Sequence, residues 1–192
     1  MVGLRTYGSE QGANAASVAA LREVGPRIYV ACLASYNNGE LVGCWIDASQ
    51  GEDGIRDDIS AMLAASPIQG AEEYAIHDYE GFGSATIDEY SSISTVARLA
   101  DLIADRGEDL IGSLAKHFSG DLDCVEAAFE DYAGTYRSLA EFMQDLTEET
   151  TEIPDNLRFY IDYEAMGRDA ELNGDLFTIE TGFEDVHVFW SR

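Results

Sequence analysis

The side chains that could do chemistry in this chain are carboxylates, and their spacing follows the repeat of an α-helix. Neighbouring acids recur at steps of three or four residues, which places them on one helix face about 5–6 Å apart. Rows of this kind attract cations or a basic surface. The predicted partner-binding surface comprises Asp101, Asp105, Glu108, Asp109, Asp121, Asp123, Glu126, Glu130, Asp131, Glu141, Asp145, Glu148, Glu149 and Glu152.

Other reactive groups do not form a recognisable catalytic or metal-binding pattern. His77, His117 and His187 stand apart in the sequence, without an HExxH motif or a cysteine pair beside them. No phosphate-binding or dinucleotide-binding glycine pattern occurs, and no GxSxG nucleophile motif. A carboxylate pair for glycoside hydrolysis stays open, because any two of 37 acids could meet in space. We therefore predict a protein that is not an enzyme, with no metal and no cofactor.

The charge balance points to a partner of opposite sign. The chain has 37 acidic and 11 basic residues, a formal charge of −26. A hydrophobic fraction of 46% is too high for disorder, so a folded surface must carry this charge. Because residues 1–26 are neutral overall, the whole excess lies in residues 27–192. Self-repulsion on this scale favours binding to a basic surface, such as the groove of a DNA-binding protein.

The sequence also predicts the compartment. No stretch approaches the roughly 18 apolar residues of a membrane span, and the first 25 residues lack the apolar run of a signal peptide. Anionic lipid would repel this surface. Three cysteines, Cys32, Cys44 and Cys124, show no CxxC spacing, so we expect buried free thiols. These features predict a cytoplasmic protein without membrane contact.

The first folded unit is predicted to be a β-hairpin, a helix and a strand. β-Prone runs at 27–36 and 41–47 flank Asn38-Gly39, a strong signal for a two-residue turn. Such a turn would pair Cys32 with Trp45 and Cys44 with Leu33, so the two thiols would face opposite sides. A helix over 55–65 and a strand over 73–79 follow.

From Ser92 onward the apolar period is mainly helical. It predicts helices from Ser92 to about 107, then over 108–118, 122–132, 138–149 and 157–172, and strands over 175–180 and 186–190. The fold class is therefore α+β. We predict an elongated chain of three small domains, with an α+β unit first, a helical unit in the middle and an α+β unit last. The predicted boundaries are a flexible leader over 1–26 and domains over 27–90, 91–134 and 135–192.

Three stretches resemble one protein family. They are RIYVACLASYNNGELVGCWIDA at 27–48, EEYAIHDYEGF at 72–82 and IPDNLRFYIDYEAMGRDAELNGDLFTIE at 153–180. Together they are similar to the ArdA antirestriction proteins. This resemblance implies an acidic homodimer, often encoded on mobile genetic elements, that mimics bent B-form DNA. Such a protein would occupy the DNA-binding groove of type I restriction–modification enzymes, formed by specificity and modification subunits, without binding nucleic acid itself.

The resemblance also implies a role for one aromatic segment. The family has an antirestriction motif that is associated with its dimer contact. In this chain the motif matches Phe159, Tyr160, Asp162, Tyr163, Glu164 and Arg168. Tyrosine, arginine and apolar residues are common at interface cores. The alternative is that Phe159, Tyr160 and Tyr163 are ordinary core aromatics of the last unit. The sequence leaves both readings open.

Two other function classes fit the composition. One is an acidic regulator that binds another basic DNA-binding protein. The other is a salt-adapted acidic enzyme with an unrecognised site, since Lys116 is the only lysine and acidic surfaces also serve solubility. Protection of unmodified DNA in a restricting host separates the antirestriction hypothesis from both.

Overall fold

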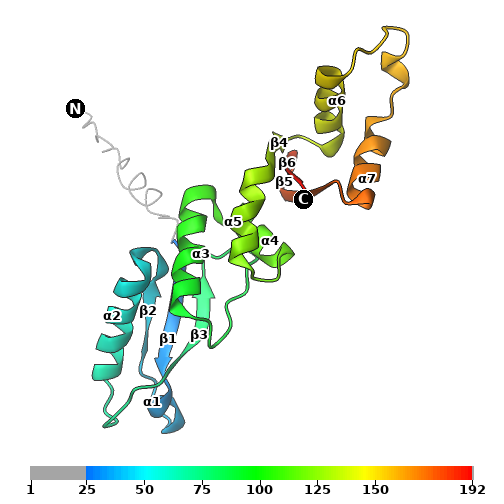
Figure 1. Cartoon of the computed structure of the whole chain (residues 1–192). Helices are drawn as coiled ribbons and strands as arrows, with labels where there is room; N and C mark the ends of the chain where they lie inside the picture. Colours follow the sequence, from blue (N-terminus) through cyan, green and yellow to red (C-terminus); the bar gives the residue numbers. More distant parts are fainter. Residues whose placement is uncertain (1–24, 192) are drawn as a thin grey trace, which may run out of the picture.

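The structure is a computed structural model that describes residues 25–191. These residues form seven α-helices and two three-stranded antiparallel sheets (Figure 1), which confirms the α+β class. The helices and strands are β1 (Arg27–Cys32), α1 (Leu33–Asn37), β2 (Gly43–Asp47), α2 (Gly51–Ala64), β3 (Tyr74–Glu80), α3 (Ile93–Arg106), α4 (Glu108–His117), α5 (Leu122–Ala128), β4 (Tyr132–Tyr136), α6 (Leu139–Thr150), α7 (Tyr163–Asn173), β5 (Leu176–Gly182) and β6 (Asp185–Trp190).

The first sheet has the order β2-β1-β3, and helices α2 and α3 lie against it (Figure 1). Alternate residues of β1, Ile28 and Val30, are fully buried. They meet Ile55 and Ile59 of α2, whose four-residue spacing places both on the inner face of that helix. A flexible leader was predicted for residues 1–26, and its residues 1–24 lie outside the described part of the chain. Pro26 is buried, and its carbonyl oxygen accepts a hydrogen bond from the Ala48 backbone.

The two-residue turn predicted at Asn38-Gly39 is wrong. Helix α1 fills part of the connection, its C-cap is Asn38, and Gly39 follows with φ of +80°. The longer connection pairs Val30 with Cys44, so Cys44 and Cys32 share a sheet face instead of opposing each other. All three thiols are free, as predicted. Only Cys32 is buried, however, and Cys124 is exposed.

Helices α3, α4 and α5 follow the first sheet and share its core. Helix α3 begins where the sequence predicted a helix, and the Ser92 side chain caps it by accepting a hydrogen bond from Thr95 N at 3.1 Å. One hydrophobic cluster runs from Ile28 in β1 to Phe189 in β6. The first two predicted units therefore do not have separate cores.

The second sheet has the order β4-β6-β5. Strand β4 was not predicted. The helix expected over 122–132 ends earlier, at Ala128, and a 3-10 turn leads from it into β4. This strand crosses the predicted domain boundary at residue 134. The division into three domains thus stays a prediction.

Each face of the second sheet packs against a different group of helices. Val186 and Val188 of β6 join Phe142 and Met143 of α6 in a second hydrophobic cluster. The next residue, Phe189, belongs to the large first cluster instead. Because neighbouring strand residues point to opposite faces, the sheet is a middle layer between the α3–α5 region and α6 with α7.

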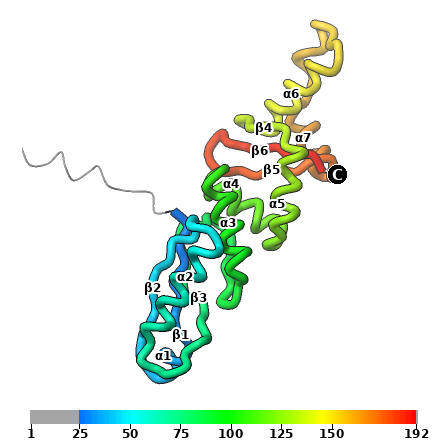
Figure 2. The backbone as a smooth tube through the Cα atoms, turned by 60° about the vertical axis from the view of Figure 1, so that its left-hand side comes forward, coloured from blue at the N-terminus to red at the C-terminus, as the bar shows by residue number. Residues whose placement is uncertain are grey.

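The helix predicted over 157–172 is wrong in its first turns. Residues 158–160 form a 3-10 turn, and α7 begins only at Tyr163, with the Asp162 carboxylate accepting a hydrogen bond from Ala165 N at 2.9 Å. In the figures the described chain is elongated. The first sheet lies at one end, and the segment between α6 and α7 projects at the other (Figures 1 and 2).

Candidate functional site

The predicted acidic residues lie on the surface of the folded chain. Twelve of the fourteen are exposed, and only Asp131 and Glu141 are half-buried. They come from α3, α4, α5, α6 and the turns that flank these helices. Amphipathic packing explains this placement, because each helix turns its apolar side inward and its carboxylates outward.

Two of these acids are already paired within the chain. The Arg98 guanidinium of α3 donates to both carboxylate oxygens of Glu126 at 2.8 and 2.7 Å, and lies 2.7 Å from Asp123. Hydrogen bonding from Arg98 lowers the pKa of Glu126 and raises that of the guanidinium. This pair joins α3 to α5, so Asp123 and Glu126 stabilise the fold as well as contributing charge.

Two further acids act at helix starts. Asp121 accepts hydrogen bonds from the backbone of Asp123 and Cys124 at the N-terminus of α5, which lowers the pKa of its carboxyl. Glu141, in the first turn of α6, accepts hydrogen bonds from the side chain and the backbone of Arg137. The Arg137 side chain is the main reason why the pKa of Glu141 is lowered.

Some of the remaining acids also have contacts within the fold. Asp131 has a contact within the fold, and Asp105 lies 3.1 Å from its neighbour Arg106. Within residues 25–191, no ion pair with a basic side chain forms at Asp101, Glu108, Asp109, Glu130, Asp145, Glu148, Glu149 or Glu152. Most of the predicted surface is therefore uncompensated.

The predicted set missed the acidic surface of the first sheet. Residues 27–90 carry 12 acids and 2 arginines, a net charge of −10, equal to the net charge of residues 135–192. The middle residues 91–134 carry −6. On α2, Asp53, Asp57 and Asp58 are exposed. The net charge of each predicted domain, considered together with the rows of acids on helices, would have revealed this second acidic end.

The aromatic segment before α7 is partly surface and partly core. Phe159 and Tyr160 are 93% and 83% exposed, so the core-aromatic reading is wrong for both. Tyr163 instead packs on the second hydrophobic cluster, and its buried hydroxyl has no hydrogen-bond partner within the described residues. Glu164 and Arg168 are exposed on α7.

An open groove separates this segment from α6. It has a volume of about 800 Å³ and is lined by residues 159–164 and by the first half of α6, including Glu141 and Asp145. The structure thus brings the aromatic motif beside one of the acidic rows. These two sets were predicted from separate parts of the sequence.

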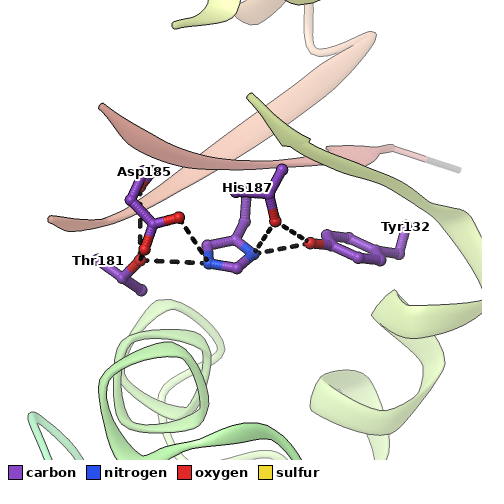
Figure 3. Close-up of polar contacts among 5 residues, drawn as sticks. Tyr132, Thr181, Asp185 and His187 are labelled. Carbon is purple, nitrogen blue, oxygen red and sulfur yellow. Dashed lines mark hydrogen bonds and ion pairs between the residues drawn. The ribbon is translucent and has the colours of Figure 1, made fainter. Parts of the chain in front are cut away.

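A polar network crosses the second sheet at His187 (Figure 3). The Nδ1 atom of His187 lies 2.8 Å from the Tyr132 hydroxyl, while Nε2 lies 3.2 Å from Thr181 Oγ1 and 3.9 Å from Asp185. Thr135 Oγ1 also lies 3.2 Å from Nδ1 and 2.7 Å from the Tyr132 hydroxyl. The network therefore links side chains of all three strands of the second sheet, which fits a structural tie between them.

The stability lost on replacing His187 by Gln is expected to be larger near pH 7.5 than near pH 5.5. Burial lowers the pKa of His187, and Asp185 only partly opposes this shift. The unfolded chain therefore takes up the proton first as the pH falls below about 6.5, and the stability given by the neutral ring is lost. Urea midpoints of both proteins at both pH values measure this difference. An equal difference at the two values would contradict it.

Within residues 25–191, no group of three or more His, Cys, Asp or Glu residues could hold a metal ion. None of the helices in that part of the chain is long and apolar enough to cross a membrane.

The fold and the surface define an acidic α+β protein that displays its charge along an elongated body. The family model for the antirestriction protein ArdA matches residues 28–185, more than three-quarters of the chain. The chain therefore belongs to the ArdA family of antirestriction proteins, which act against restriction–modification enzymes. No curated protein matches the chain.

Proposed function

We propose that this protein mimics bent B-form DNA and occupies the DNA-binding groove of a type I restriction–modification enzyme. Family membership gives the antirestriction function. The observation that supports mimicry is the distribution of charge, with −10 in each of residues 27–90 and 135–192 and exposed, unpaired carboxylates between them. Lysine and arginine side chains that normally bind phosphates would meet these carboxylates. The protein would then be an inhibitor without catalytic activity or cofactor, acting in the cytoplasm.

Charge spacing limits how closely a helix can imitate a duplex. One carboxylate per turn gives one charge per about 5.4 Å, against one per about 1.7 Å of DNA axis. The mimic would therefore copy the positions of selected phosphates and not their density. A homodimer would double the length of the acidic surface. Since phosphate contacts carry no base information, one inhibitor could act on enzymes with different target sequences.

Preformed shape would supply part of the affinity. Bending a 20–30 bp site costs DNA about 1–6 kcal/mol by elastic estimates. A folded protein that already has the required shape does not spend this free energy on binding. It would therefore compete with DNA despite its lower charge density.

Competition with DNA is the decisive test. A fluorescently labelled duplex bound to the methyltransferase core, made of specificity and modification subunits, should be released stoichiometrically by the purified protein. The apparent dissociation constant of the protein should rise in proportion to added unlabelled DNA. If DNA and protein bind the core together with unchanged affinities, the proposal is wrong. Tight binding to a different basic protein without protection of unmodified DNA would favour an acidic regulator, and turnover of a small molecule would favour an enzyme.

A further inference from the structure

Helix α4 lies between the first sheet and the second (Figures 1 and 2), and its N-terminal half packs against the loop that leaves the first sheet. A Cβ atom on Gly112 would lie 2.6 Å from the Ser84 backbone nitrogen and 2.8 Å from the Phe82 carbonyl oxygen. A Cβ atom on Gly83 would collide with the Glu108 carbonyl oxygen. Real Cβ atoms do not approach backbone so closely, so this contact requires glycine on both sides.

The same loop is anchored in the first core. Phe82 is 1% exposed, and its ring packs edge-on against Tyr79 of β3, with centroids 6.1 Å apart. Gly83 has φ of +56°, which favours glycine independently of the close contact. The loop is thus fixed to the first sheet on one side and to α4 on the other.

The C-terminal end of α4 is held by the second sheet. His117 stacks on Phe177 of β5 with ring centroids 4.5 Å apart and an interplanar angle of 12°. Phe177 in turn stacks on Phe189 of β6 at 5.0 Å. Figures 1 and 2 both show α4 beside β5. Parallel stacks of this kind fix orientation as well as distance.

From these contacts we propose that α4 is the spacer that sets the geometry between the two acidic ends. A ten-residue helix spans about 15 Å and bends little, so holding both of its ends fixes the loop after β3 relative to strand β5. Gly83, Gly112, His117 and Phe177 are then positioning residues for antirestriction, although they contribute no carboxylate. This role rests on the proposed DNA mimicry, because the distance between the two acidic ends affects affinity only when the partner's basic residues have fixed positions.

Gly112→Ala tests the glycine contact, and His117→Ala tests the aromatic one. Gly54→Ala on α2 is the matched control, because the three atoms nearest to its added Cβ all belong to the flexible side chain of Gln50. Small-angle scattering of the free proteins should show a changed distance distribution for Gly112→Ala and none for Gly54→Ala. Affinity for the methyltransferase core should fall about tenfold for Gly112→Ala and less for His117→Ala, whose side chain is already exposed.

Salt dependence separates positioning from simple destabilisation. If one acidic end no longer reaches its basic sites, fewer ion pairs form, and the slope of log affinity against log salt becomes shallower. A merely destabilised variant loses active fraction but keeps the wild-type slope. Should Gly112→Ala fail to fold, His117→Ala carries the same test from the other end of the helix.

Unchanged scattering and an unchanged slope in both folded variants would overturn the inference. Altered scattering with wild-type affinity would overturn it too, because the geometry would then not matter to the partner. The scattering measurement does not involve the enzyme. If the wild-type protein fails to compete with DNA, the proposed mimicry falls, while scattering still decides whether α4 sets the shape.

Discussion

Neutralising Asp145, Glu148 and Glu149 together is expected to weaken binding to the methyltransferase core about tenfold at low salt, mainly by slowing association. Glu148 and Glu149 follow Asp145 by about one helical turn on α6, and all three are exposed, with none in an ion pair within the described residues. Glu141 of the same row is omitted because Arg137 already binds it. Changing the three to Asn, Gln and Gln keeps their shape and removes only charge.

The effect should be collective. Each carboxylate contributes to a spread field, so a single neutralisation in this row should change affinity only slightly. Removing like charges one turn apart should also leave α6 at least as stable as before. Fluorescence anisotropy with labelled DNA as competitor, at two salt concentrations, measures the loss. One single substitution that abolishes inhibition in a folded protein would show that an individual residue dominates instead.

The informative control is a variant that loses the same number of charges from helix α2, beside the first sheet. Asp53, Asp57 and Asp58 of α2 are also exposed and carry the same three charges. If the partner contacts the whole length of the protein, the α2 and α6 variants should lose similar affinity. A loss confined to α6 would place the main contact in the last unit. Unchanged affinity of the α6 variant would contradict the proposed role of that row.

Replacing Phe159 and Tyr160 with Ser is expected to convert the proposed homodimer into a monomer at micromolar concentration. Both rings are almost fully exposed in the single chain, at 93% and 83%. Burying four such aromatics in a dimer would remove about 800 Å² from water, at about 25 cal/mol per Å². This apolar term must outweigh repulsion between two chains of −26. We therefore expect the double variant to weaken dimerisation about 100-fold or more.

Salt and a matched aromatic distinguish this contact from others. Phe183, in the β5–β6 turn, is 92% exposed, so Phe183→Ser controls for the loss of an equally exposed ring elsewhere. Added salt should strengthen the dimer by screening repulsion but weaken the contact with a basic groove. Light scattering at low and high ionic strength measures the molar mass and therefore the oligomeric state directly. A wild-type protein that is monomeric in both buffers and still fully inhibitory would remove dimerisation from the mechanism.

Local signals in the sequence located most of the helices correctly. Ser92 marks the start of α3 because a serine oxygen at this position satisfies a free backbone N–H of the first turn. The helix predicted over 138–149 corresponds to α6 at Leu139–Thr150, since its apolar residues repeat at the helical period. The exposure of the acidic rows follows from the same period.

Errors arose where the outcome depends on distant residues. The turn after β1 was misread because Asn38-Gly39 is a local signal, whereas the register depends on how much chain α1 takes up. The sequence did not predict strand β4, because its five residues, YAGTY, form a strand only by pairing with β6, about fifty residues later. The aromatic run at 159–163 gave no sign of which rings would be buried.

The sequence by itself determined the charge, the α+β class and the resemblance to the antirestriction family, because composition and local periodicity do not depend on packing. The tertiary structure alone decided which carboxylates are free. Arg98 reaches Glu126 across 28 residues, while the α6 row meets no cation apart from Arg137 within the described residues. It also decided that Phe159 and Tyr160 lie outside the core and that α4 packs against both the loop after β3 and strand β5. These properties are set by contacts between segments far apart in the chain, and no local pattern encodes such distances.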